Sequence, residues 1–119
     1  MNTESFVSVI RESVRTLAVD GTLSTLIKVP GRAPNPKLIA LSNWYNSLTS
    51  ADQENLKQVV QESVNAALFH TLCILDGVAA VEPDGNSGTF ELIYHREGQS
   101  TVITPNEAVD YLHDLYNTE

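Results

Sequence analysis

The spacing of apolar residues predicts a helix over residues 3–18. Five apolar side chains recur there every three or four positions, which is the period of a helix with one buried face: Phe6, Val7, Ile10, Val14 and Leu17. Asn2 or Thr3 is the expected N-cap, because its side-chain oxygen accepts a hydrogen bond from a free backbone N–H of the first turn. Asp20-Gly21 is the expected end, since glycine commonly follows the last residue of a helix.

A second helix is expected after the proline-rich loop at residues 29–36. Asn35 is placed as its N-cap and Pro36 at the first helical position, where the missing N–H of proline is harmless. The apolar positions of this helix again have helical spacing: Leu38, Leu41, Tyr45 and Leu48. Trp44 lies beside this stripe, and the pattern allows it to be either a core residue or an interface residue.

A third, long helix is predicted over residues 51–76, with Thr49 or Ser50 as its N-cap. Helical periodicity continues through this whole segment until the chain reaches a glycine. At 1.5 Å per residue the helix spans about 39 Å. A helix of that length crosses the whole body of a small domain, so it is expected to be the central element. Leu68 and Leu72 are therefore expected to be among the most buried residues.

The pattern changes to short strands in the last third of the chain. Residues 89–95 and 100–104 are rich in β-branched and aromatic side chains and flank a turn, which predicts a β-hairpin. The apolar run at residues 78–82 is a candidate for a third strand. The string Thr104-Pro-Asn-Glu107 has the residues of a capping box with proline in its preferred place, which predicts that a last helix begins there.

These elements predict one α+β domain over residues 1–119. It contains N-terminal helices with one long central helix, a small two- or three-stranded antiparallel sheet (hairpin at about 89–104), and a C-terminal helix. The chain of 119 residues has a typical single-domain length, and its 42% apolar and 18% charged residues are globular values. No run approaches 18 consecutive apolar residues, so no membrane span is expected. The N-terminal segment has no apolar signal-peptide core and Cys73 is a lone cysteine, so we expect a cytoplasmic protein.

Charge is the composition feature that bears on function. The formal net charge is −8. Residues 1–60 contain six basic and five acidic side chains, whereas residues 61–119 contain one basic and ten acidic side chains, a charge of −9. Such a surface disfavours nucleic acid and anionic membranes, and it favours a basic protein partner or cations, or simply serves solubility. The candidate partner-binding residues are Glu82, Asp84, Glu91, Glu97, Asp110 and Asp114.

Two clusters of histidine and carboxylate residues are candidates for chemistry. His70, Cys73 and Asp76 recur every three residues on the long helix, and these residue types bind zinc, but their spacing lacks the His pair of a helical zinc site. In the last helix, His113 is close in sequence to two aspartates, and His95 on the hairpin joins them if the two elements meet.

Both clusters also have a purely structural interpretation, in which Cys73 is a small buried residue and the other side chains belong to exposed polar helix faces. We therefore predict no metal site and no cofactor; the weak candidates for a metal ligand are His70, Asp76 and His113.

These patterns favour a small, acidic protein-binding domain without catalytic activity, of an inhibitor, immunity-type or regulatory kind. The sequence has no Gly-x-Ser-x-Gly, Cys-x-x-Cys or Gly-x-Gly-x-x-Gly motif. Two alternatives stay open. One is a metal-dependent or His/Asp-based enzyme that uses the groups above. The other is a structural subunit, since the chain is expected to be either a monomer or a homodimer formed through surplus apolar surface on the long helix.

Overall fold

The chain divides into two compact units. The computed structural model describes residues 1–79, 81–82, 88–106 and 110–118. Unit 1 comprises residues 1–14 and 66–119, and unit 2 comprises residues 15–65. The division falls within two long helical segments, so each unit contains a part of both.

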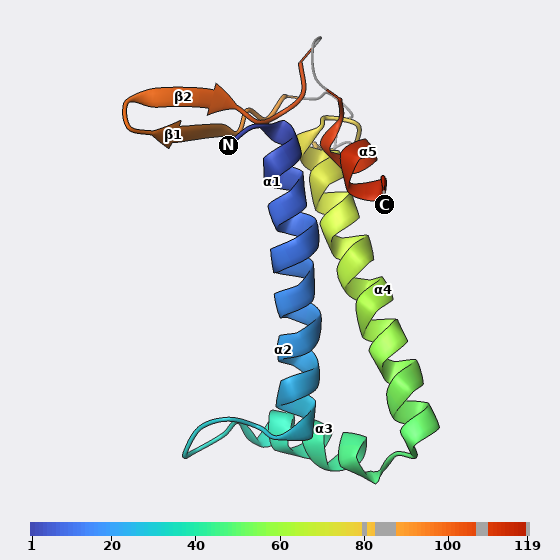
Figure 1. Cartoon of the computed structure of the whole chain (residues 1–119). Helices are drawn as coiled ribbons and strands as arrows, with labels where there is room; N and C mark the ends of the chain where they lie inside the picture. The colour runs from blue at the N-terminus through green and yellow to red at the C-terminus, as the bar shows by residue number, and fades with distance from the viewer. Residues whose placement is uncertain (80, 83–87, 107–109, 119) are drawn as a thin grey trace. The chain divides into compact units, whose positions relative to one another are not determined.

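The fold is α+β, as predicted, with helices first, then a hairpin, then a short helix (Figure 1). The helical elements are α1 (Thr3–Val9), the π-helical turn η1 (Ile10–Val14), α2 (Arg15–Ile27), α3 (Pro36–Ser47), α4 (Ser50–Leu75) and α5 (Leu112–Asn117). The strands are β1 (Ile93–Arg96) and β2 (Gln99–Val102), which form one antiparallel pair.

Three predicted helix caps are confirmed. The Asn2 Oδ1 atom accepts a hydrogen bond from the Ser5 backbone N–H at 2.9 Å, and the Ser5 hydroxyl accepts one from the Asn2 N–H at 2.8 Å. Asn35 accepts a hydrogen bond from the backbone N–H two residues later at 2.8 Å, with proline at the first helical position. Thr49 accepts one from the N–H three residues later at 3.1 Å. Each cap satisfies N–H groups that the helix itself leaves unpaired.

The predicted end of the first helix at Asp20-Gly21 is wrong, because α2 continues to Ile27. Glycine inside a helix costs only about 1 kcal/mol relative to alanine, which neighbouring interactions can offset. Here the hydroxyls of Thr22 and Thr25 donate to carbonyl oxygens one turn earlier in the helix, at 2.7 and 2.9 Å. The hydroxyl groups of these threonines are thus hydrogen-bonded within the helix, and the helix continues through them.

A π-helical turn interrupts the apolar stripe that the sequence predicts. The stripe is buried or half-buried as far as Ile10, but Val14 at the end of η1 is exposed, and Leu17 in α2 is 72% exposed. A π turn accommodates one extra residue, which rotates the following side chains by about 100° relative to a continuous α-helix. Val19 is instead the buried residue of α2.

The long helix α4 ends where predicted, through backbone hydrogen bonds made by Gly77 and its successor. The Gly77 N–H donates to the Ile74 carbonyl at 3.1 Å, and the Val78 N–H donates to the Cys73 carbonyl at 3.2 Å. This pair of bonds is a Schellman motif, and it requires the positive φ of +76° that glycine adopts at no steric cost. The motif fixes Asp76 as the last residue before the chain leaves the helix.

The predicted hairpin is confirmed, with Tyr94 of β1 opposite Thr101 of β2. Its two-residue turn, Glu97 and Gly98, has positive φ at both positions (51° and 78°), which is the turn type that suits the twist of paired strands. The described residues of the run 78–82 form no strand. The sheet that the structure describes therefore has two strands.

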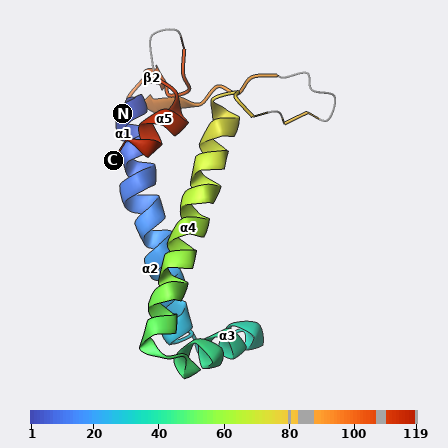
Figure 2. The ribbon, with the colours of Figure 1, turned by 90° about the vertical axis from the view of Figure 1, so that its right-hand side faces the viewer.

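Unit 1 has a core built from four separate segments of the chain. Its buried apolar residues are Val7, Leu72, Ile103, Leu112 and Tyr116. Leu72 is 2% exposed, as predicted, whereas Leu68 is only partly buried at the edge of this cluster. The helix α5 packs on α1, as the second ribbon view shows (Figure 2). The Thr3 hydroxyl also donates to the Ile103 carbonyl at 2.9 Å, which links α1 to the end of the hairpin.

The predicted capping box at Thr104 is wrong. The two residues after Thr104 are not helical, and α5 begins only at Leu112. The Thr104 hydroxyl is buried and accepts a hydrogen bond from the Leu92 N–H at 3.3 Å, so a tertiary contact to the hairpin replaces the expected local one. Glu107, the other half of the predicted box, lies outside the described residues.

Unit 2 is a small helical assembly in which α3 connects α2 to the beginning of α4. The Asn46 side chain donates to the Ile27 carbonyl at 3.0 Å, and the Gln53 side chain donates to the Tyr45 carbonyl at 3.0 Å. These bonds join the ends of consecutive helices. Trp44 is 49% exposed, which answers the question that the sequence left open: it is a surface residue of unit 2.

Candidate functional site

Asp76 and His113, two of the three weak metal-ligand candidates, are in direct contact within unit 1. The Asp76 side chain has no exposed surface. Its Oδ1 atom accepts a hydrogen bond from the Leu112 backbone N–H at 2.8 Å, and its Oδ2 atom accepts one from the His113 backbone N–H at 2.9 Å. The Nδ1 atom of the His113 ring lies 2.5 Å from the same Oδ2 atom. One buried carboxylate thus has three hydrogen-bond partners at the beginning of α5.

This carboxylate acts as the N-terminal cap of a helix from another part of the chain. The residue at the N-cap position of α5, Tyr111, makes no side-chain capping bond. At the other end of α5, the Arg11 guanidinium donates to the Leu115 carbonyl at 2.9 Å. A helix of six residues is not stable alone in water. Asp76 and Arg11 therefore hold α5 in place from both ends.

The surroundings of His113 are largely aromatic. Phe69 meets the His113 ring edge-on at a centroid distance of 5.6 Å, and Tyr111 covers it at 5.5 Å. On its outer side, the Nε2 atom lies 3.3 Å from a carboxylate oxygen of Asp114, whose side chain is 65% exposed. His113 thus lies between a buried and an exposed carboxylate, with little open space around its ring.

The residues that the sequence grouped as possible metal ligands do not form a ligand set. The His70 ring packs against Phe69 at a centroid distance of 5.5 Å, and it is Phe69, not His70, that packs against the His113 ring. His95 lies on the hairpin, where its ring nitrogen contacts the Ser100 hydroxyl at 2.6 Å. Among the residues described, no three His, Cys, Asp or Glu side chains have an arrangement that could hold a metal ion.

Cys73 is a buried thiol on α4, one helical turn before Asp76. Burial raises the pKa of the Cys73 thiol above its ordinary value, and the negative charges of Asp76 and Asp114 raise this pKa further. A thiol in this environment stays protonated at neutral pH. Since the thiolate is the nucleophilic form, the surroundings of Cys73 oppose nucleophilic chemistry.

The raised pKa of Cys73 predicts slow alkylation of the native protein by iodoacetamide at pH 8, and fast alkylation in denaturant. It also predicts a pH effect on stability. A thiol with a raised pKa in the folded state stabilises the fold below the unfolded thiol pKa of about 8.5, and this contribution is lost at higher pH. The free energy of unfolding should therefore decrease more steeply above that pH in the wild type than in Cys73→Ala. Equal slopes, or fast native alkylation, would contradict the assignment.

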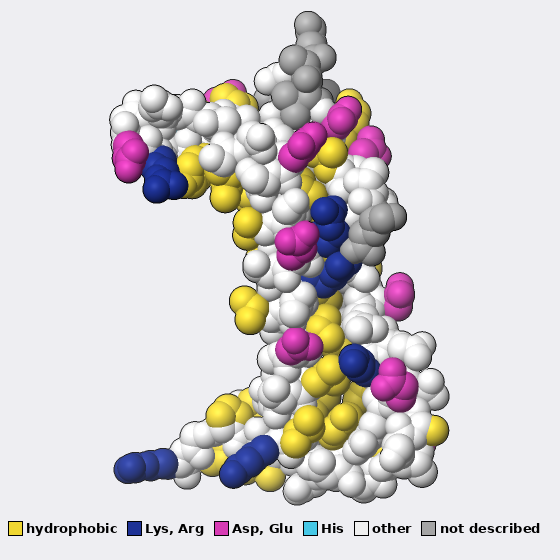
Figure 3. Space-filling view, in the orientation of Figure 1, with side chains coloured by type: hydrophobic (Ala, Val, Ile, Leu, Met, Phe, Trp, Pro, Cys, Tyr) yellow, Lys and Arg dark blue, Asp and Glu magenta, His cyan; other side chains and the backbone are white. Residues whose placement is uncertain are grey.

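The five described acidic candidates are all exposed side chains of unit 1: Glu82, Glu91, Glu97, Asp110 and Asp114. Asp84 lies outside the described residues. The hairpin and α5 are on opposite sides of α1, and acidic side chains are visible both beside α5 and at the tip of the hairpin (Figures 1 and 3). Glu97, in the hairpin turn, is therefore not brought together with Asp114.

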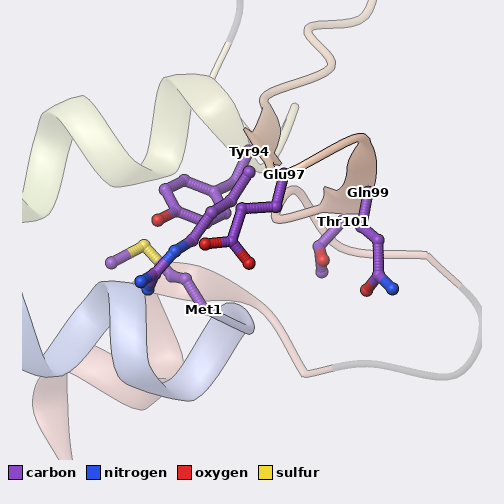
Figure 4. Close-up of a pocket in the computed structure, with 6 residues that line it drawn as sticks. Met1, Tyr94, Glu97, Gln99 and Thr101 are labelled. Atoms are coloured by element: carbon purple, nitrogen blue, oxygen red, sulfur yellow. The ribbon is translucent and has the colours of Figure 1, made fainter.

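A hollow of about 320 Å³ lies between the hairpin and the beginning of the chain. Six residues line it: Met1, Tyr94, Arg96, Glu97, Gln99 and Thr101. The Met1, Tyr94 and Glu97 side chains turn toward one another in it (Figure 4). Arg96 places a positive charge beside Glu97, so this hollow is not part of a uniformly acidic surface.

Unit 2 contains an apolar groove that the sequence analysis missed. Its volume is about 370 Å³, and residues of α2 and α3 line it: Gly21, Thr22, Thr25, Leu26, Leu38 and Leu41. Hydrophobic side chains gather where these two helices meet (Figure 3). The prediction failed here because the first helix was expected to end at Gly21. The signal that could have revealed the groove is Gly21 followed one helical turn later by a small side chain, Thr25.

Comparisons with known proteins give no relative for this chain. It matches no protein-family model, no curated protein and no solved structure. In the part of the chain that the structure describes, no helix combines the length and the apolar character that crossing a membrane requires.

Proposed function

We propose that this protein is a binding domain for a basic protein partner, of an inhibitory or regulatory kind, and that unit 1 carries the binding surface. The observation that supports this most strongly is the separation of charge between the units. Unit 1 contains two basic residues and eleven acidic ones, a formal charge of −9, whereas unit 2 contains five basic and four acidic residues, a charge of +1. If the acidic residues served only solubility, they would not need to be concentrated in one of the two units.

The contacts of the few cations in unit 1 strengthen this argument. Arg11 donates to the Leu115 carbonyl and belongs to the packing of α5, so it does not project toward a partner. Arg96 lies at the hairpin, next to the turn that carries Glu97. The exposed acidic residues Glu91, Asp110 and Asp114 thus have few positive charges near them. An acidic field of this kind speeds the capture of a basic protein.

An enzyme that uses the His/Asp groups is the weaker alternative. The Asp76 carboxylate is fully buried, and all three of its hydrogen bonds go to residues at the beginning of α5. Among the described residues, no buried side-chain nitrogen or oxygen lacks a hydrogen-bond partner. The contacts of Asp76 and His113 are therefore accounted for by holding α5.

The proposal predicts salt-sensitive capture of basic proteins. Proteins bound from an extract of the source cells by the immobilised chain should be basic. They should be released as the salt concentration increases from about 0.01 to about 0.15 M, because the Debye length shrinks from about 30 to about 8 Å. The double variant Glu91→Lys/Asp110→Lys should lower the association rate of the captured partner at least several-fold, with a smaller change in its dissociation rate.

The matched control reverses two exposed acidic residues of unit 2, in the variant Glu54→Lys/Glu62→Lys. It changes the net charge by the same amount, so it should leave the association rate nearly unchanged if unit 1 faces the partner. The proposal fails if the partner binds equally well at both salt concentrations. It also fails if the two double variants weaken binding to the same extent.

A further inference from the structure

We infer that the groove between α2 and α3 is the contact surface between two copies of this chain, which associate as a twofold-symmetric dimer. This inference does not rest on the proposed function, because it concerns unit 2 and a different kind of surface. Three properties of the groove support it: its shape, its apolar area and its charge.

The groove and its rim are complementary in shape to a second copy. The α2 side of the groove is formed by three small residues, Gly21, Thr22 and Thr25, together with Leu26. A side chain added at Gly21 would meet nothing within 4 Å, so the hollow is open there. Leu17 lies one helical turn before Gly21 on the same face of α2 and is 72% exposed. A projecting leucine beside a hollow is the arrangement that an isologous contact uses, since each copy inserts its leucine into the groove of the other.

The exposed apolar area is consistent with a dimer interface. On α3, Leu38 and Leu41 line the groove, and the exposed Trp44 is a neighbour of Leu41 on the helix surface, three positions later. Together with Leu17 these side chains expose roughly 400 Å², which is about half of the roughly 800 Å² that each partner contributes to a standard interface. An apolar centre of that size surrounded by polar residues is the usual composition of such an interface. A half-exposed tryptophan at its edge is also a common hot-spot residue.

The charge of unit 2 allows two copies to approach each other through this face. Its formal charge is +1, so two such units repel each other little. Unit 1 has a charge of −9, and two copies meeting through that unit would repel each other strongly at low salt. A second copy of this chain therefore fits the α2–α3 groove and not the acidic surface.

The test is the mass of the full-length chain in solution, measured by sedimentation equilibrium from low micromolar to several hundred micromolar concentration. The wild type is expected to form a dimer whose dissociation constant changes little with salt. Leu17→Glu places a charge on the rim and should weaken association at least tenfold. The Cβ atom of a larger side chain has open space at Gly21, so Gly21→Gln should occupy the groove and weaken association similarly while the helical circular dichroism is retained.

Val78→Glu is the matched control, since Val78 is a half-exposed apolar residue of unit 1 and its replacement adds the same charge. This variant should dimerise like the wild type. A wild type that stays monomeric over the whole concentration range overturns the inference. A dimer that tolerates both groove variants, or that Val78→Glu disrupts equally, overturns it as well. None of these results depends on the capture of a basic partner, so the two proposals can fail separately.

Discussion

Leu72→Ala is expected to lower the free energy of unfolding by about 2–5 kcal/mol. Leu72 is 2% exposed and contacts a core to which α1, α5 and the end of the hairpin all contribute. Truncation removes apolar surface from this core and leaves a cavity, because residues held by four separate chain segments cannot all move inward. A loss of this size is a large part of the total stability of about 5–15 kcal/mol that is typical of a small domain.

The measurement is urea unfolding followed by circular dichroism, with the midpoint and the slope compared between variant and wild type. Val59→Ala is the control on the same helix, because Val59 is 58% exposed. Alanine favours a helix slightly more than valine does, so this control should change the stability by less than about 0.5 kcal/mol. A loss below about 1 kcal/mol for Leu72→Ala would show that α4 does not bury this face.

Asp76→Ala is expected to cost about 2–4 kcal/mol, because it leaves the Leu112 and His113 N–H groups without an acceptor at a buried helix end. The effect should be local as well as large. Amide hydrogen exchange should become faster throughout α5, while exchange in the middle of α4 follows only the loss of global stability. Asp76→Asn should cost less, since its remaining carbonyl oxygen can still accept one of these hydrogen bonds.

Asp110→Ala is the control for this prediction. Asp110 is an exposed aspartate close to the same helix end, and its replacement should change the stability by less than about 0.5 kcal/mol. If Asp76→Ala has an equally small effect and exchange in α5 is unchanged, then Asp76 is not what holds this helix. A metal-dependent or catalytic role of Asp76 would then be the better explanation of its position.

The features that the sequence predicted correctly are those that depend on neighbouring residues. The caps at Asn2, Asn35 and Thr49 each involve a side chain and a backbone N–H two or three positions away, and the end of α4 depends on the conformation of Gly77. Interactions of such short range are the same in almost any tertiary setting. For this reason composition and spacing are sufficient to place these helix ends.

Two of the features that were missed depend on residues far apart in the chain. Asp76 and His113 are separated by 37 positions, and their contact follows from the packing of α5 on the core. The capping box predicted at Thr104 failed for a related reason. The Thr104 hydroxyl accepts a hydrogen bond from the Leu92 N–H, twelve positions earlier in the chain, in place of the predicted bond within a helix. The sequence identified Asp76 and His113 as weak candidates for metal ligands, whereas in the structure Asp76 caps the helix that contains His113.

Because the π turn η1 precedes α2, the direction of the α2 side chains depends on the number of residues in this turn as well as on which residues α2 contains. Leu17 and Val19 lie on different sides of α2, and the one extra residue of η1 turns both of them by about 100° relative to a continuous α-helix. No substitution at either position would restore a regular α-helix there, but deletion of one residue from 10–14 would rotate every later side chain of α2 by about 100°. Relatives that lack this residue would thus keep nearly the same α2 sequence and present a different face of it. A comparison by sequence identity alone would not detect that difference.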